Sequence, residues 1–184
     1  MCAKAPPFPR VSIVVPCFNA ERTVARCVEA CLHQEYPNLE IIFADDGSGD
    51  STPAILGAYD GIEVLSQENS GAAAARNLGW RSSSGEIICF TDSDCVPNPR
   101  WVSKLVEHYT DPTVGGVGGS YDIANSGSWL ARCIHEEIRH RHLRMPRQVN
   151  YLGSFNVSYR RAVLEQIGGF DEGFRRASAE DNDL

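Results

Sequence analysis

The sequence feature that most constrains the fold is an alternation of strand-like and helix-like segments through the first half of the chain. Val11–Val15 is a β-branched run that ends at Pro16, and Leu39–Ala44 is a second run that ends at an acidic turn. Both runs have the composition of buried strands. Between them, apolar side chains recur at three- and four-residue steps over residues 24–32, which predicts a helix packed on a sheet, with Asn19 as its cap. This segment therefore predicts a strand, a helix and a parallel strand in succession.

The same alternation continues beyond this unit. Further elements are expected as a short helix opened at Ser51–Pro53, strands at Ile62–Leu65 and Glu86–Thr91, and helices at Gly71–Ser83 and from Asn98. Repeated strand–helix pairs of this length predict an α/β fold, namely a Rossmann-like, mostly parallel sheet with helices on both faces.

From Val114 the pattern is less regular. The expected elements are a strand at Val114–Tyr121, a polar helix at Gly127–Leu143, an extended segment at Val149–Val157 and a helix at Arg160–Ile167. No internal repeat or low-complexity linker divides the chain. One domain over residues 1–184 is therefore predicted, with a nucleotide-binding half at 1–97 and a second half at 98–184.

Composition excludes several classes of protein. The formal net charge of −7 disfavours nucleic-acid binding, because such proteins neutralise phosphates with basic residues. The longest uncharged apolar stretch, Val11–Ala20, is far shorter than the roughly 20 residues that a membrane span needs. Residues 1–10 do not resemble a secretory signal, so a cytoplasmic location is expected. The seven cysteines form no C-x-x-C pair and are expected to be free thiols.

Polar residues follow three of the expected strands, and most of them are acidic. They are Pro16–Asn19, Asp45–Ser48 and Asp92–Asp94. Because ligands bind beyond the carboxyl ends of parallel strands, these segments are expected to border one site. Carboxylates that converge repel one another unless a cation joins them, and Mg²⁺ or Mn²⁺ prefers oxygen ligands. Taken singly, each segment is equally typical of a turn or a helix cap.

Several common catalytic motifs are absent from the sequence. It has no G-x-x-x-x-G-K-[ST], no G-x-G-x-x-G after the first strand, no G-x-S-x-G and no H-E-x-x-H. These absences argue against P-loop and dinucleotide enzymes, α/β-hydrolases and zinc proteases of that type.

Six motifs in order resemble glycosyltransferase family 2, whose members have the GT-A fold. They are residues 11–21 (VSIVVPCFNAE), 45–52 (DDGSGDST), 69–77 (NSGAAAARN), 92–94 (DSD), 168–172 (GGFDE) and 180–184 (EDNDL). The resemblance spans nearly the whole chain. It implies transfer of a sugar from a nucleotide diphosphate sugar, with a uridine nucleotide expected, to an acceptor hydroxyl with inversion at the anomeric carbon.

The resemblance also assigns roles to residues of the nucleotide half. Pro16 and Phe18 are expected at the base, and an aromatic ring suits stacking on it. Asp46, in preference to Asp45, is expected to accept the imide proton of the base. Arg76 is expected near the nucleotide, although a surface arginine is the alternative. Asp92 and Asp94 match the family's D-x-D motif, in which Asp92 reaches the ribose or the metal and Asp94 coordinates Mn²⁺ or Mg²⁺.

Residues of the second half are assigned in the same way. Asp181 matches the general base, and the adjacent Glu180 is placed with it near the donor and acceptor. Gly153, Asn156 and the pair Arg160–Arg161 are expected to border the donor sugar and the acceptor. Without the upstream motifs, the acidic end would be interpreted as a helix N-terminus.

The basic run at residues 139–147 has two interpretations. The first is a solvated loop. The second is an acceptor-side loop that contacts diphosphate or anionic lipid, which would place the protein at the inner face of a membrane with a polysaccharide, lipid-linked or protein-glycan acceptor.

Two alternatives to a glycosyltransferase stay open from the sequence. Residues 87–96 also fit the D-x-D-x-V motif of haloacid dehalogenase phosphatases, although the only lysines are Lys4 and Lys104. A non-catalytic sugar-nucleotide-binding fragment is the other. Because the sequence ends three residues after Asp181, an incomplete acceptor site and slow turnover are expected.

Overall fold

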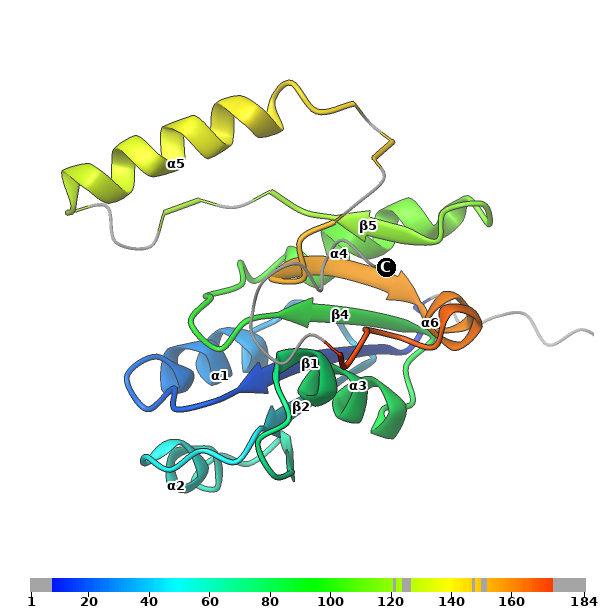
Figure 1. Ribbon diagram of the computed structural model, residues 1–184. Helices are drawn as coiled ribbons and strands as arrows, with labels where there is room; N and C mark the ends of the chain where they lie inside the picture. Colours follow the sequence, from blue (N-terminus) through cyan, green and yellow to red (C-terminus); the bar gives the residue numbers. More distant parts are fainter. Residues whose placement is uncertain (1–7, 121, 124–126, 147, 150–151, 174–184) are drawn as a thin grey trace, which may run out of the picture.

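A six-stranded sheet forms the centre of the computed structural model, which describes residues 8–120, 122–123, 127–146, 148–149 and 152–173 (Figure 1). The strand order is β3-β2-β1-β4-β6-β5. The strands are β1 (Val11–Cys17), β2 (Leu39–Asp45), β3 (Glu63–Ser66), β4 (Ile87–Thr91), β5 (Gly116–Gly118) and β6 (Asn156–Arg160). β1 pairs in parallel with both β2 and β4, and β2 pairs in parallel with β3.

The sixth strand departs from the expected pattern. The sequence predicts extended structure at 149–157, whereas β6 covers Asn156–Arg160 and is antiparallel to β4 and β5. The register pairs Thr91 with Asn156 and Ile87 with Arg160. Asn156 therefore lies at the carboxyl edge of the parallel strands, and Arg160 lies at the opposite edge.

Helices cover both faces of the sheet, as the sequence predicts. On one face lie α1 (Val24–Leu32), α2 (Thr52–Leu56), α4 (Trp101–Val106) and the 3₁₀ helix η1 (Glu107–Thr110). On the other lie α3 (Ala72–Ser82) and α6 (Arg161–Ile167). Alternate residues of β1 point to opposite faces, so Ile13 packs with α1 while Val14 packs with α3. The α/β fold with a mostly parallel sheet is thus confirmed.

The helix α5 (Trp129–His142) lies apart from these layers, beyond β5 (Figure 1). Trp129, Leu130 and Ile134 on this helix are exposed. None of the helices that the structure describes is long and apolar enough to cross a lipid bilayer.

Pro16 is accommodated in a central strand because the ladder between β1 and β4 stops at Val14. The carbonyl of Cys17 accepts a hydrogen bond from the backbone of Asp46, on the β2 side. Backbone groups of successive residues point to opposite sides of a strand, so the nitrogen of Pro16 points to the side where pairing has ended.

A partly buried carboxylate joins three elements at the opposite edge of the sheet. Glu40 of β2 accepts hydrogen bonds from the hydroxyl of Ser12 on β1 and from the Ser84–Gly85 turn before β4. Arg10 adds an ion pair at 2.9 Å. Burial raises the pKa of Glu40, but the hydrogen bonds from Ser12, Ser84 and Arg10 outweigh it and lower the value to about 2.

Candidate functional site

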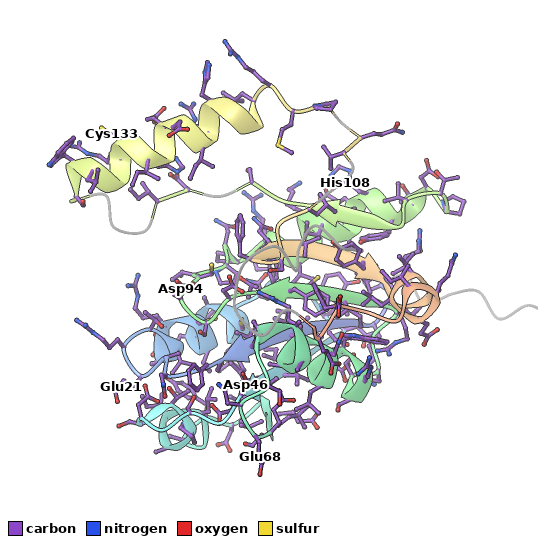
Figure 2. The ribbon with its side chains drawn as sticks, viewed as in Figure 1. Glu21, Asp46, Glu68, Asp94, His108 and Cys133 are labelled. Carbon is purple, nitrogen blue, oxygen red and sulfur yellow. The ribbon has the colours of Figure 1, made fainter. Side chains whose placement is uncertain are left out.

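The carboxyl ends of β1, β2 and β4 lie side by side, and the three polar segments leave the sheet at this edge. Figure 2 labels Asp46 after β2 and Asp94 after β4 at this end of the molecule. Phe18, directly after β1, keeps 52% of its side chain exposed. An aromatic ring beside buried strands is therefore open to a ligand.

Reciprocal hydrogen bonds tie the loop after β1 to the loop after β2. The amide of Asn19 donates to the Ser48 hydroxyl at 2.9 Å, and its side-chain oxygen accepts from Gly49 at 2.9 Å. The amide of Glu21 donates to Asp50 at 3.1 Å. Asn19 has a positive φ of 50°, and α1 is preceded by Thr23, so the expected helix cap at Asn19 is wrong. The residue instead joins two loops that border the site.

Both carboxylate oxygens of Asp46 accept hydrogen bonds from other residues of the chain. One carboxylate oxygen accepts from the amide of Ser70 at 2.8 Å and from the Gln67 side chain at 2.6 Å. The other accepts from the amide of Gly71 at 2.8 Å, at the start of α3. A carboxylate in this position satisfies free N–H groups and complements the helix dipole. Asp46 therefore acts as the anchor of α3.

Asp45, in contrast, has a hydrogen-bond partner among the described residues for only one of its two carboxylate oxygens. Its side chain is 3% exposed, and one oxygen accepts from the amide of Ser48 at 3.3 Å. Within the described part of the chain, the other oxygen, Oδ1, is buried and has no hydrogen-bond partner. A buried polar atom without a partner is costly unless a ligand or water satisfies it. The structure thus favours Asp45 over Asp46 as an acceptor for a bound molecule.

Arg76 on α3 is buried and reaches the first aspartate of the D-x-D segment. Its guanidinium donates to Oδ1 of Asp92 at 3.0 Å. The expected alternative of a surface arginine is wrong for this reason. The ion pair leaves a buried positive charge beside the edge at which phosphate groups would meet Asp92.

Asp94 is exposed and borders a groove. The groove has a volume of about 1180 Å³ and lies between the loop after β4, α4 and the segment after β5. Burial and the nearby Asp94 raise the pKa of the Cys95 thiol to about 11, so Cys95 is protonated at neutral pH. Asp94 therefore presents an exposed carboxylate at the border of the groove.

The described residues fit a divalent cation of a particular kind. They contain no cluster of three or more His, Cys, Asp or Glu side chains arranged around a metal. Mg²⁺ is commonly held by one or two carboxylates, with phosphate oxygens and water completing its shell. Asp94, with Asp92 beside it, matches that donor set.

Asn156 lines the groove but is held by structural contacts. Its side-chain oxygen accepts from the Trp101 indole at 2.8 Å, and its amide group donates to the Ser120 carbonyl at 2.7 Å. Asn156 therefore joins α4, β5 and β6 at the groove wall. Gly153 lies in the loop just before β6 and packs closely, since a Cβ there would meet Phe155 at 2.7 Å.

Arg160 and Arg161 do not border the donor site. Arg160 donates to the carbonyl oxygens of Val114 and Tyr109, and Arg161 donates to the carbonyl of Gly85 at 2.7 Å. Both lie at the amino edge of the parallel strands, because β6 is antiparallel to β4. Their expected place near the sugar is wrong, and their role is structural.

Two further predictions concern residues that lie outside the described part of the chain or away from the carboxyl edge of the sheet. Glu180 and Asp181 lie outside the described residues. Residues 139–146 of the basic run cover the end of α5 and the segment after it, away from the sheet (Figure 1), and residue 147 lies outside the described residues. The free state expected for the cysteines is confirmed for those the structure describes, which are Cys17, Cys27, Cys31, Cys89, Cys95 and Cys133.

Sequence reasoning missed Asn77, which is buried on α3 next to Arg76. Its partners lie in the G-G-F-D-E segment at 168–172, which the sequence marked as a motif without a physical role. A polar residue on the apolar side of an alanine-rich helix was the available signal.

Comparisons with known proteins identify relatives of this chain by sequence and by fold. A statistical model of glycosyl transferase family 2 matches residues 12–168. Glycosyltransferase AglE of Haloferax volcanii is 31% identical over 173 residues, which cover 89% of this chain and 56% of the relative. The pre-mycofactocin glycosyltransferase of Mycobacterium tuberculosis is 31% identical over 184 residues, which cover 95% of this chain and 38% of the relative. The chain thus spans about half or less of the length of these relatives.

Solved structures show the same fold. The mannosyltransferase PcManGT from Pyrobaculum calidifontis, in complex with GDP-Man and Mn²⁺, superposes with a TM-score of 0.74 at 24% identity. The match covers 96% of this chain and 50% of that one. S. aureus TarS 1-349 in complex with UDP gives a TM-score of 0.69 at 22% identity over 94% of this chain and 53% of that one.

Proposed function

The chain belongs to glycosyl transferase family 2, and we propose that it binds a nucleotide diphosphate sugar and transfers the sugar to an acceptor hydroxyl with inversion. The observation that carries this proposal is the carboxyl edge of the sheet, where Asp45 ends β2 and the exposed Asp94 follows β4, on either side of β1. Among the described residues, the buried Oδ1 of Asp45 has no hydrogen-bond partner. Asp45 is suited to a base and Asp94 to a cation beside phosphates. The haloacid dehalogenase alternative has no support from the family match.

The base is proposed to lie between Phe18 and Asp45, beside the backbone of Pro16. The free oxygen of Asp45 accepts the imide N–H of uracil, and the exposed ring of Phe18 stacks on the base. The UDP in the TarS complex supports a uridine nucleotide, whereas the GDP-Man in the PcManGT complex makes guanosine the alternative to test.

Asp94, with Asp92, is proposed to hold Mn²⁺ or Mg²⁺ at the diphosphate. When bound, such a cation neutralises negative charge that develops on the leaving nucleoside diphosphate. Arg76 supports this site from α3, because its ion pair fixes Asp92. The Mn²⁺ in the PcManGT complex supports a metal of this class.

Asp181 is proposed as the general base, with Glu180 beside it, Asn156 at the wall of the groove and Gly153 in the loop before β6. An ordinary aspartate has a pKa of about 4, far below that of a sugar hydroxyl. It can accept the proton only as the acceptor oxygen bonds to the anomeric carbon, which favours a concerted displacement with inversion.

Slow hydrolysis of a UDP-sugar in Mn²⁺ tests the assignment of Asp181. We expect Asp181→Asn to lower the rate by on the order of 10²-fold, because a positioned base typically contributes that much. Asp183→Asn, a carboxylate of the same segment, is the matched control and should keep the wild-type rate. Equal rates for wild type and Asp181→Asn would contradict the role of Asp181.

The basic surface around α5 is proposed to contact an anionic lipid headgroup, at the inner face of a membrane, where a lipid-linked acceptor would lie. Arg132, Arg139 and Arg144 are exposed there, and so are Leu130 and Ile134, which lie one turn apart on α5. An apolar strip bordered by arginines is typical of helices that lie on anionic membranes.

Vesicle pelleting tests the membrane contact. We expect binding to phosphatidylserine vesicles at low salt that falls steeply as salt rises, because exposed charges are screened. Arg139→Glu with Arg144→Glu should abolish the binding, whereas Lys104→Glu, on α4, should not. Absence of binding at low salt would overturn the proposal.

A further inference from the structure

Asn77 makes four hydrogen bonds, three of which tie α3 to the segment at residues 168–172. Its side chain is 1% exposed. The amide group donates to the Phe170 carbonyl at 2.8 Å and to the Glu172 carboxylate at 2.7 Å. The side-chain oxygen accepts from the Phe170 amide at 3.0 Å and from the Trp80 indole at 2.9 Å. Every hydrogen-bonding position of the Asn77 amide is therefore aimed at a defined partner.

The backbone of the segment is shaped to reach Asn77. Gly168 and Gly169 both have positive φ, at 87° and 86°. A Cβ on Gly169 would lie 2.4 Å from the Asn77 oxygen, whereas a Cβ on Gly168 would meet nothing within 4 Å. Glycine is therefore needed at position 169 both for its positive φ and because the backbone approaches the Asn77 side chain closely, whereas at position 168 it is needed only for the positive φ.

The contact continues to the candidate site through Phe170. Its ring packs edge-on against Phe90 at 5.0 Å between centroids, and the guanidinium of Arg76 lies over it at 5.5 Å. Arg76 in turn donates to Asp92 at 3.0 Å. By holding the backbone of Phe170, Asn77 therefore also holds the ring that packs behind the Arg76–Asp92 pair.

We propose that Asn77 is a positioning residue for the transferase reaction, which holds residues 168–172 on α3 so that Phe170 supports Arg76 behind Asp92. The inference rests on the proposed function for its effect on turnover. Asn77 acts through these residues and not by contact with substrate.

A pair of glycine variants separates the contact from backbone strain. Gly168→Ala and Gly169→Ala impose the same cost of positive φ, but only the second places a methyl group against Asn77. Hydrogen–deuterium exchange of the peptide that contains Phe170 is the direct measurement. We expect Gly169→Ala to speed exchange there about tenfold more than Gly168→Ala does, since buried hydrogen bonds are lost.

A double-mutant cycle tests the bond between Asn77 and Glu172. Asn77→Asp replaces the donor with a carboxylate that faces the Glu172 carboxylate, and Glu172→Gln restores a donor in the reverse direction. We expect Asn77→Asp to speed exchange of the segment about tenfold and the double variant to recover part of that change.

Turnover distinguishes a positioning role from a merely structural one. With Mn²⁺ present, Asn77→Asp and Gly169→Ala should lower kcat for UDP-sugar hydrolysis by on the order of 10²-fold, because small misplacements of reacting groups have effects of that size. The Kd for UDP should rise by a smaller factor than kcat falls, because Asp45 and Asp94 are unchanged and only the support behind the Arg76–Asp92 pair is disturbed.

Hydrogen exchange and kcat test the role of Asn77, whereas UDP binding by the wild-type chain tests the proposed function. Unchanged exchange in Asn77→Asp and Gly169→Ala would overturn the inference, and so would faster exchange with an unchanged kcat. If the wild-type chain binds no UDP in Mn²⁺, the proposed function fails, and the exchange measurements still establish whether Asn77 holds the segment. Thermal unfolding of each variant shows that the measured chain is folded.

Discussion

At the scale of single residues, two adjacent aspartates have opposite roles. Both oxygens of Asp46 accept hydrogen bonds, from Gln67, Ser70 and Gly71, whereas one buried oxygen of Asp45 has no partner among the described residues. The difference comes from strand geometry, because successive side chains leave a strand end in different directions. One carboxylate anchors a helix, and its neighbour is left for a ligand.

Asparagine variants of the two positions should separate stability from binding. Asp46→Asn loses an acceptor for buried N–H groups at α3 and should lower the free energy of unfolding by about 1–3 kcal/mol. Asp45→Asn keeps an oxygen for Ser48 but turns an N–H group toward the base, and should weaken UDP binding about tenfold or more. Urea unfolding and calorimetry measure the two effects. A loss of UDP binding in Asp46→Asn alone, with stability unchanged, would contradict the assignment.

The sequence could identify the acidic pair, and the resemblance ranked Asp46 first, but no local pattern shows which carboxylate already has partners within the fold. Only the β3–α3 loop, which supplies Gln67, Ser70 and Gly71, shows that Asp46 is already satisfied. These partners lie more than twenty residues away along the chain, so no local pattern reveals them. The same holds for Asn77, whose partners at 170 and 172 become visible only after folding.

At the scale of elements, the regular half of the chain follows its pattern closely. β1 and β2 extend the expected runs by one or two residues, and α3 falls within the predicted helix. The strand β6 could not be placed from the sequence because its residues include Asn156 and Arg160, which are not typical of a buried strand. Its position is set by pairing with β4 and β5, which are distant in the chain.

The joint between β1, β2 and the turn before β4 should depend on pH through Glu40. Its lowered folded-state pKa, about 2 against an ordinary 4.5, means that the stabilisation is complete above the ordinary value and is lost as the pH falls toward 2. We expect Glu40→Gln to be less stable than wild type at pH 7, with a difference that shrinks between pH 5 and about pH 2.

Urea unfolding at several pH values measures this difference, and Glu63→Gln, an exposed glutamate on β3, is the control. A difference between wild type and Glu40→Gln that stays constant from pH 7 to about pH 2 would show that Glu40 is not held in its charged form.

At the scale of the whole molecule, the two faces of the sheet and its carboxyl edge serve different purposes. Both faces are buried by helices, so the residues proposed to bind the donor gather at the edge where β1, β2 and β4 end. In the proposed function, a cation allows the acidic residues of that edge to coexist with a diphosphate. The segment at 168–172 then joins the far part of the chain to this edge through Asn77.

Isothermal titration calorimetry with UDP, with and without Mn²⁺, tests the central claim most directly. The account predicts that Mn²⁺ tightens UDP binding by about tenfold or more, and that Asp94→Asn removes this gain. Asp60→Asn, an exposed carboxylate between α2 and β3, should keep it. UDP binding that is absent, or equally tight with and without Mn²⁺, would contradict a metal-assisted nucleotide-sugar site at this edge.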